Sequence, residues 1–218
     1  GYALSGGSGV DRSPNIAENL NPANYAGNDI TNPNVFASVF SGMVSALTAN
    51  GAKGVVANVP YITDLANFIT VPYNPVPLDA GTAGAVNGAY AAYNGGIQQA
   101  FAYLVSVSAM TQEMADAEIA KRTISFAAGQ NAVVMIDEDL TDLTAINPGL
   151  ISMRQTTADD LLLLAGSAFI GTLADPNNPG SVNGVAVPLG DQWVLTPEEQ
   201  LAIRTATDAY NTTIATVA

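Results

Sequence analysis

One stretch decides the expected fold: Asn50-Gly51-Ala52-Lys53-Gly54-Val55-Val56-Ala57-Asn58-Val59-Pro60, at residues 50–60. It contains a short continuous apolar run, residues 54–59, that is bounded by Gly and Pro. A run of this kind is typical of a strand that is buried on both faces of a parallel sheet. We therefore expect residues 54–59 to form a buried strand.

A helix is expected directly before this strand, because apolar residues recur there at spacings of three and four. Asn34 can cap its start, and Asn50-Gly51 can end it in a left-handed turn. The apolar residues of this pattern are Val35, Phe36, Val39, Phe40, Met43, Val44 and Leu47. A helix, a tight turn and a buried strand make up half of a βαβ unit, which predicts an α/β domain.

The sequence of residues 61–195 predicts a large excursion from that unit. Pro72, Pro75 and Pro77 interrupt its first part. Further on, Asp79 can cap a long Ala-rich helix that reaches about Ser106, and Thr111 can cap a shorter helix. Residues 124–126 and 132–136 predict the two strands of a small hairpin.

The two ends of the chain differ in character. Residues 1–34 are rich in Gly, Asn and Pro and predict a long loop. Thr196-Pro197-Glu198-Glu199 is the clearest helix start in the chain, with an N-cap Thr, a Pro at the first helical position and a Glu three residues after the cap. We expect one domain over residues 1–218, incomplete because strands that belong to its sheet lie outside the chain.

The composition excludes several kinds of site. The 218 residues contain no Cys and no His, and 6 basic against 19 acidic residues give a net charge of −13. The chain therefore cannot supply a Ser-His-Asp or Cys-His system or a His/Cys zinc site by itself. Its acidity excludes nucleic acid as a partner, and only 11% of its residues are charged, a composition that favours an extracytoplasmic location.

The stretch from Asn34 to Pro60 resembles the middle of the SGNH hydrolases, also called GDSL lipases or esterases. Three further stretches resemble the large lipolytic lipoproteins of the Bacteroidetes: Thr70-Val71-Pro72-Tyr73-Asn74-Pro75, Phe126-Ala127-Ala128-Gly129-Gln130-Asn131-Ala132-Val133 and Asp191-Gln192-Trp193-Val194-Leu195-Thr196-Pro197. The resemblance implies a partial flavodoxin-like three-layer α/β domain with a large lid-like insertion. It also implies a bacterial outer-membrane, cell-surface or secreted location.

The family's catalytic blocks are missing from this chain. Its Gly-Asp-Ser, Gly-x-Asn-Asp and Asp-x-x-His blocks do not occur, and Asp191-Gln192-Trp193-Val194 has Val where the last block needs His. The resemblance thus implies the central part of a carboxylic-ester hydrolase that acts on an ester or an acylated glycan or lipid, with no cofactor. The alternative is a non-catalytic surface lipoprotein or binding subunit with protein partners at the bacterial cell surface.

Two groups of residues are candidates for a site. The aromatic residues Tyr61, Phe68 and Tyr73 could line a substrate groove beside the Pro-rich segment, although ordinary packing explains them equally well. Four carboxylates within six residues could offer oxygen ligands to calcium, but the spacing lacks the Gly and the terminal Glu of an EF-hand loop. These residues are Asp137, Glu138, Asp139 and Asp142. A solvated acidic loop is favoured over a metal site, and no metal ligand is assigned.

Overall fold

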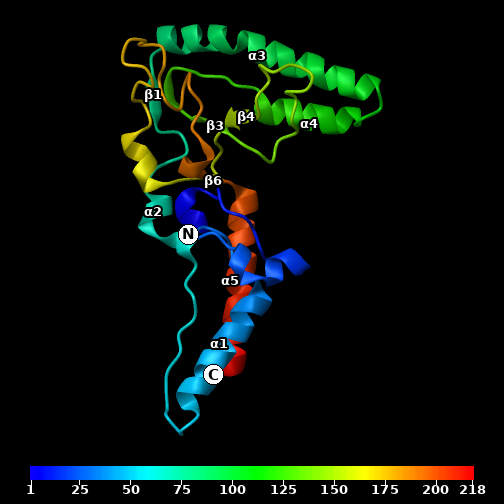
Figure 1. The fold of residues 1–218 in the computed structure, drawn as a ribbon. Coiled ribbons are helices and arrows are strands. Elements are labelled where there is room, and N and C mark those ends of the chain that lie inside the picture. The colour runs from blue at the N-terminus through cyan, green and yellow to red at the C-terminus, as the bar shows by residue number, and fades with distance from the viewer.

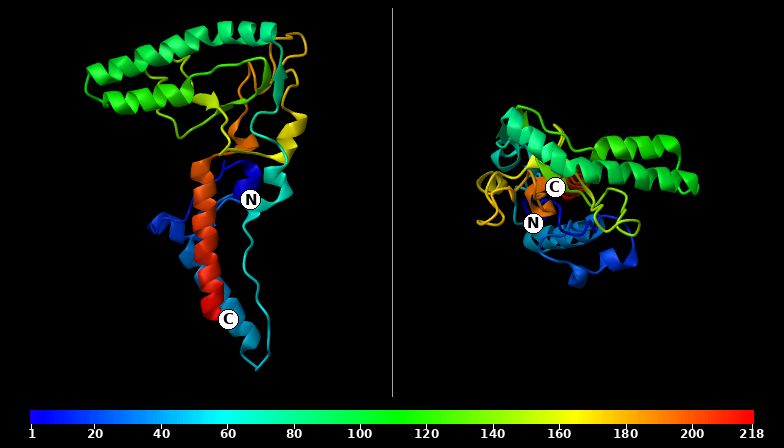
Figure 2. Two further views of the ribbon diagram at one scale, coloured as in Figure 1. Left: turned by 180° about the vertical axis from the view of Figure 1, so that it is seen from behind. Right: turned by 90° about the horizontal axis from the view of Figure 1, so that it is seen from above.

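Two pairs of helices define the shape of the molecule. The computed structural model describes residues 1–218. In Figure 1 the helices α3 (Ala80–Ser106) and α4 (Gln112–Arg122) lie together in the upper part, with α3 along the top and α4 beneath it. The helices α1 (Pro33–Thr48) and α5 (Pro197–Val217) lie side by side in the lower part, as Figure 2 shows from behind.

The strands are short and form three separate two-stranded sheets. Each pair is antiparallel: β1 with β2, β3 with β4, and β5 with β6. The bounds are β1 Val76–Leu78, β2 Gly129–Asn131, β3 Val134–Ile136, β4 Met153–Gln155, β5 Leu161–Leu162 and β6 Val194–Leu195. The chain thus mixes helices with small antiparallel sheets, and no parallel three-layer sheet is present among its residues.

The predicted buried strand at residues 54–59 is wrong for this chain. Residues 52–61 contain no strand, and the Val55 side chain is 99% exposed. Figure 1 shows the segment as a long extended line beside the lower helices. The physical reason is that no other segment of these 218 residues pairs with residues 54–59, so the Val55 side chain has nothing to pack against.

Three predicted helix starts are confirmed, those at Asp79, Thr111 and Thr196, whereas the predicted cap at Asn34 is wrong. The Asp79 carboxylate accepts the backbone N–H groups of Gly81 and Thr82 at the start of α3, and the Thr111 hydroxyl accepts that of Met114 at the start of α4. Thr196 and Glu199 form a reciprocal capping box at the start of α5. These signals are local, which is why the sequence alone reveals them.

Helix α1 begins two residues earlier than its apolar pattern suggested. Its N-cap is Asn32, whose side-chain oxygen accepts the N–H of Asn34, and Pro33 occupies the first helical position. Gly51 has the expected left-handed conformation, with φ of 79°. No residue of α1 is buried, because only one side of the helix meets α5.

The predicted hairpin at residues 124–136 is wrong. Residues 124–126 form no strand, since their backbone groups bond to two amide side chains of α3: Asn94 binds the N–H and C=O of Ile124, and Asn87 binds those of Phe126. The strand β2 pairs with β1, and β3 pairs with β4. Side chains from a distant helix therefore take the place of a neighbouring strand.

Two hydrophobic cores hold the molecule together. All 20 buried residues of the larger core lie within residues 76–194, so the expected lid-like excursion contains the main core. The smaller core has seven residues: Ala3, Ile30, Phe68, Leu163, Leu195, Ile203 and Ala206. Adjacent residues of β6 serve different cores, Val194 the larger one and Leu195 the smaller.

The amino-terminal loop is ordered by short 3-10 helices and by Arg12. The helices are η1 (Tyr2–Ser5), η2 (Ala17–Leu20) and η3 (Pro22–Asn24). Arg12 donates to the Asp29 carboxylate and to the carbonyl of Asn24. The remaining short helices are η4 (Ile62–Asp64), α2 (Ala66–Ile69), η5 (Leu164–Ala168) and η6 (Asp191–Trp193). Among all these helices there is none that combines the length and apolar character needed to cross a membrane.

Candidate functional site

The three aromatic residues expected along a substrate groove lie in different surroundings. The Tyr61 ring is partly exposed, its hydroxyl donates to the Asp208 carboxylate, and the guanidinium of Arg204 lies 5.9 Å from the ring centre. Phe68 is 1% exposed and belongs to the smaller core. Tyr73 is partly exposed, and its carbonyl accepts the hydroxyl of Thr156. The structure thus places Phe68 in packing and the two tyrosines at the surface.

The carboxylates of residues 137–142 have different partners and do not form one site. Asp137 is buried and pairs with Arg154, and its other oxygen accepts the N–H of Asp139. Asp142 accepts both the N–H and the hydroxyl of Thr144. Only Glu138 of this run points toward carboxylates from elsewhere in the chain.

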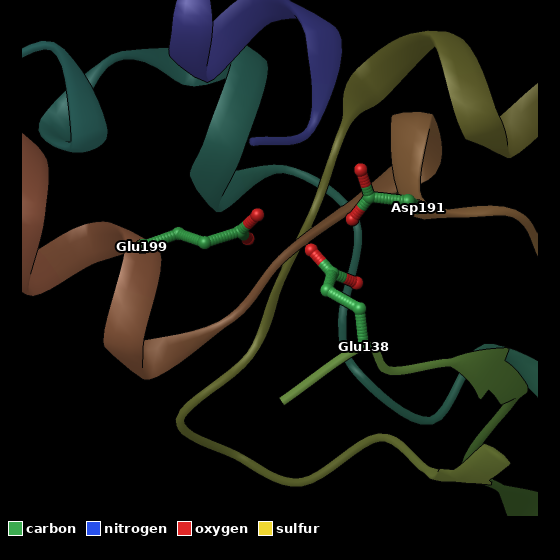
Figure 3. Close-up of side chains that lie close together, drawn as sticks. All are labelled: Glu138, Asp191 and Glu199. Atoms are coloured by element: carbon green, nitrogen blue, oxygen red, sulfur yellow. The ribbon is translucent and has the colours of Figure 1, made fainter. Parts of the chain in front are cut away.

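Glu138 meets Asp191 and Glu199, and these three form the carboxylate cluster of the molecule. One oxygen from each lies within 4.8 Å of the others. Figure 3 shows the three side chains pointing toward one another from separate segments. Glu138 follows β3, Asp191 begins η6, and Glu199 lies in the first turn of α5. None of the three takes part in an ion pair with Lys or Arg.

The capping box fixes Glu199 within this cluster. Its Oε2 accepts the N–H of Thr196 at 2.7 Å, whereas its Oε1 is buried and has no hydrogen-bond donor. Gly7 makes room for this carboxylate: a Cβ on Gly7 would lie 1.4 Å from Oε1, and the φ of Gly7 is 82°. Gly7, within the predicted loop of residues 1–34, is therefore packed tightly against the cluster.

The cluster changes the acidity of its members. Burial and then the charge of Glu138 raise the pKa of Asp191 to about 7. Burial, together with the charge of Asp191, raises the pKa of Glu199 to about 8, although the backbone N–H of Thr196 acts in the opposite direction. Both carboxyls thus titrate near neutral pH, unlike ordinary surface acids.

A second set of buried charges surrounds Arg154. Its guanidinium donates to Asp160 through Nη1 at 2.7 Å and Nη2 at 2.8 Å, and its Nε donates to Asp137. Asp160 also accepts the N–H of Thr157. Every charge in this triad has a partner, so we assign it a structural role.

A small cavity lies where the extended segment ends. Its volume is about 170 Å³, and its lining includes Gly1, Val59, Pro60, Ile203 and Tyr210. The backbone of Val59 is held there by Asn211, which accepts its N–H at 2.7 Å and donates to its carbonyl at 3.0 Å. The carboxyl end of residues 54–59 therefore has a fixed position beside the first residues of the chain.

A larger and more apolar cavity lies in the upper part. It has a volume of about 560 Å³, within the usual range for sites that bind small molecules. It lies between β1, the start of α3 and the loop that includes Pro179 and Val185. None of its lining residues is charged, so it offers apolar contact without acid–base chemistry.

Sequence reasoning identified only one member of the carboxylate cluster. Asp191 and Glu199 follow Glu138 by 53 and 61 residues, and no spacing rule joins them. The one available signal was the capping box, which placed Glu199 at the start of a helix directly after an apolar pair. Comparison of this chain with protein-family models, curated proteins and solved structures found no match in any of the three.

Proposed function

We propose that this chain is the central part of an extracytoplasmic carboxylic-ester hydrolase of the SGNH type, with its nucleophilic Ser and general-base His on polypeptide outside these residues. The proposed substrate is an ester or an acylated lipid or glycan at the bacterial surface. In the complete domain, residues 54–59 form a strand of a parallel, flavodoxin-like sheet, and the upper part covers the cleft. The absence of His from the sequence requires the outside contribution.

The observation that carries the proposal is that the extended segment before Val59 has no strand beside it. Residues 52–58 take part in no hydrogen bond, with either the backbone or the side chains of the rest of the chain. They nevertheless include two adjacent exposed valines, Val55 and Val56. An extended backbone with free N–H and C=O groups and apolar side chains is suited to pair with another strand.

The neighbouring helix adds support, because it also leaves apolar side chains uncovered. Val39, Met43 and Leu47 of α1 are 54%, 52% and 75% exposed. In three-layer α/β domains the helices that flank a strand bury such residues against the sheet. Partner strands beside residues 54–59 would supply the missing surface for these side chains.

The carboxyl end of residues 54–59 is the expected position of the substrate. In open α/β sheets, ligands bind outside the carboxyl ends of the strands. Here that end, Val59-Pro60, meets Gly1 around the small cavity. In an SGNH-type site the Ser attacks the ester carbonyl, the His accepts the Ser proton, and N–H groups stabilise the oxyanion. The role of this chain is to hold that edge and to exclude water.

Hydrolysis of short-chain nitrophenyl esters tests this proposal. We expect turnover by the polypeptide that includes the flanking sequence, with Gly-Asp-Ser before and Asp-x-x-His after these residues, and none by the 218-residue chain. Replacing the His of the last block by Gln in the longer polypeptide is the matched control and should abolish turnover.

Two results would contradict the proposal. Turnover by the 218-residue chain alone would show that the chemistry needs no outside Ser or His. If the longer polypeptide binds lipid esters but does not hydrolyse them, the alternative function, a non-catalytic surface protein, is favoured over the hydrolase.

A further inference from the structure

We propose that Glu138, Asp191 and Glu199 form a binding site for a divalent cation, calcium in particular. This inference does not depend on the proposed hydrolase activity, because it concerns residues that lie outside the small cavity at the strand end. Figure 3 shows the convergence of the three carboxylates that suggests it.

The unsatisfied oxygens distinguish this cluster from an ordinary acidic surface. Glu199 is 5% exposed, its side chain points toward the other two carboxylates in Figure 3, and its Oε1 is buried without a donor. The Oδ1 of Asp191 is also buried and has no donor. A buried carboxylate oxygen without a hydrogen bond is costly to desolvate, so native structures supply such an oxygen with a donor, a proton or a cation.

The geometry suits calcium. Calcium takes oxygen ligands at 2.3–2.6 Å, so that two ligands on opposite sides of the ion lie about 5 Å apart. The three carboxylate oxygens lie within 4.8 Å of one another and can therefore share one ion. Calcium accepts irregular sets of six to eight ligands, whereas magnesium demands a near-ideal octahedron. Carboxylates that come from a loop, a 3-10 helix and the first turn of an α-helix favour the former.

The surroundings hold the site in place before any ion arrives. Glu199 is fixed by the capping box, since its other oxygen accepts the N–H of Thr196. The carbonyl of Asp191 packs against Gly6, where a Cβ would approach it to 2.2 Å. A cation at this point would join the loop after β3, η6 and the start of α5.

The charged groups around the cluster are mostly acidic. Asp137 and Asp139 lie on the same loop as Glu138 and add negative potential at Asp191. Arg154 and Lys121 act on Asp139, and Arg154 is already engaged by Asp137 and Asp160. Carboxylates bind a metal ion in their deprotonated form, so the affinity should increase with pH.

Terbium luminescence gives a direct test, because Tb³⁺ occupies calcium sites and emits when a nearby indole is excited. Trp193, the single Trp of the chain, lies two residues from Asp191 in η6. We expect sensitised emission at about pH 8 that calcium reverses and magnesium does not at equal concentration, with weaker binding at about pH 5.

Glu199→Gln is the informative variant, because Gln at this position also completes a capping box. It should weaken terbium and calcium binding roughly tenfold or more, whereas Glu198→Gln removes the same charge from the adjacent exposed residue and should leave binding unchanged. Circular dichroism checks that both variants are folded. If Glu199→Gln does not fold, Asp191→Asn takes its place with the same expectation.

The proposal is overturned if the folded chain gives no sensitised emission at pH 8, or if Glu198→Gln weakens binding as much as Glu199→Gln. Equal displacement by magnesium would contradict the assignment to calcium. Neither readout involves ester hydrolysis, so these outcomes remain distinct from those that test the proposed function.

Discussion

Arg154 lies between two carboxylates in the interior, with Asp137 on one side and Asp160 on the other. The contact with Asp160 uses two parallel N–H···O bonds, a geometry that Lys cannot reproduce. Removal of the guanidinium would leave two buried negative charges without a partner. The cost of this change comes mainly from the acids that remain, not from the lost attraction.

We therefore predict that Arg154→Gln lowers the free energy of unfolding by about 3–5 kcal/mol. Arg204→Gln is the matched control: Arg204 is exposed, forms no ion pair and lies near the ring of Tyr61, so the loss should be about 1 kcal/mol or less. Urea denaturation followed by circular dichroism measures both. Similar losses in the two variants would show that the triad around Arg154 is not a stabilising unit.

The sequence reveals what a residue does locally but not which distant residues it meets. Thr196 and Glu199 are three positions apart, and their capping box could be read directly. The meeting of Glu199 with Glu138 depends on how η6 and the loop after β3 pack, and the sequence contains no rule for that. The acidic residues 137–142 are adjacent in the sequence and suggest a shared site, but Asp137 pairs with Arg154 and Asp142 accepts the hydroxyl of Thr144.

At the scale of elements, the helices can form from their own residues, whereas the extended segment needs a neighbouring strand to form a sheet. The helices α3, α4 and α5 begin at capping residues that satisfy their own first N–H groups. A strand has no such internal partner, because its hydrogen bonds belong to its neighbours. Residues 54–59 have the composition of a strand and an extended backbone, but no neighbouring strand among these residues.

Val55 offers a test of the expected pairing. In the 218-residue chain, Val55→Lys should change the free energy of unfolding by no more than about 0.5 kcal/mol, because the side chain is 99% exposed. In the longer polypeptide, the same change should lower thermal stability and esterase activity, since it places a charge in the sheet.

Val107→Lys serves as the control for this change, because Val107 is also exposed but lies at the end of α3, away from the segment. It should have little effect in either polypeptide. Equal effects of the two substitutions in the longer polypeptide would mean that residues 54–59 do not enter a sheet.

At the scale of the whole molecule, the carboxylate cluster gives stability an unusual dependence on pH. Asp191 and Glu199 have pKa values of about 7 and about 8 in the folded chain, against ordinary values near 4 when it is unfolded. At pH values between the unfolded and the folded pKa, these two carboxyls keep their protons in the folded state and have lost them in the unfolded state. Stability must therefore decrease as pH rises through this interval.

We predict that the free energy of unfolding, measured in chelator without calcium, falls by on the order of 2–4 kcal/mol from pH 5 to pH 8. The loss is smaller than two full shifts because Asp191 is partly exposed and solvent screens its charge. Glu199→Gln should flatten this slope, whereas Glu198→Gln, which has the same net charge, should retain it. A stability that rises over this interval would contradict the assignment.

The overall architecture could be predicted only in part. The helices α1, α3, α4 and α5 and the mixture of helix and strand could be predicted from the sequence, because periodicity and caps are local. The pairing of strands did not: β1 finds its partner more than fifty residues later, at β2, and the side chains of Asn87 and Asn94 replace a strand beside residues 124–126. Such contacts depend on the packing of the whole chain.

The short pair of β5 and β6 has a consequence for how the molecule unfolds. Leu162 and Val194 pack in the larger core, while Leu195 packs in the smaller core and Leu161 packs against it. Because consecutive side chains of these strands point in opposite directions, separation of β5 from β6 would open both cores together. The upper and lower parts that look distinct in Figure 1 are thereby coupled into one cooperative unit.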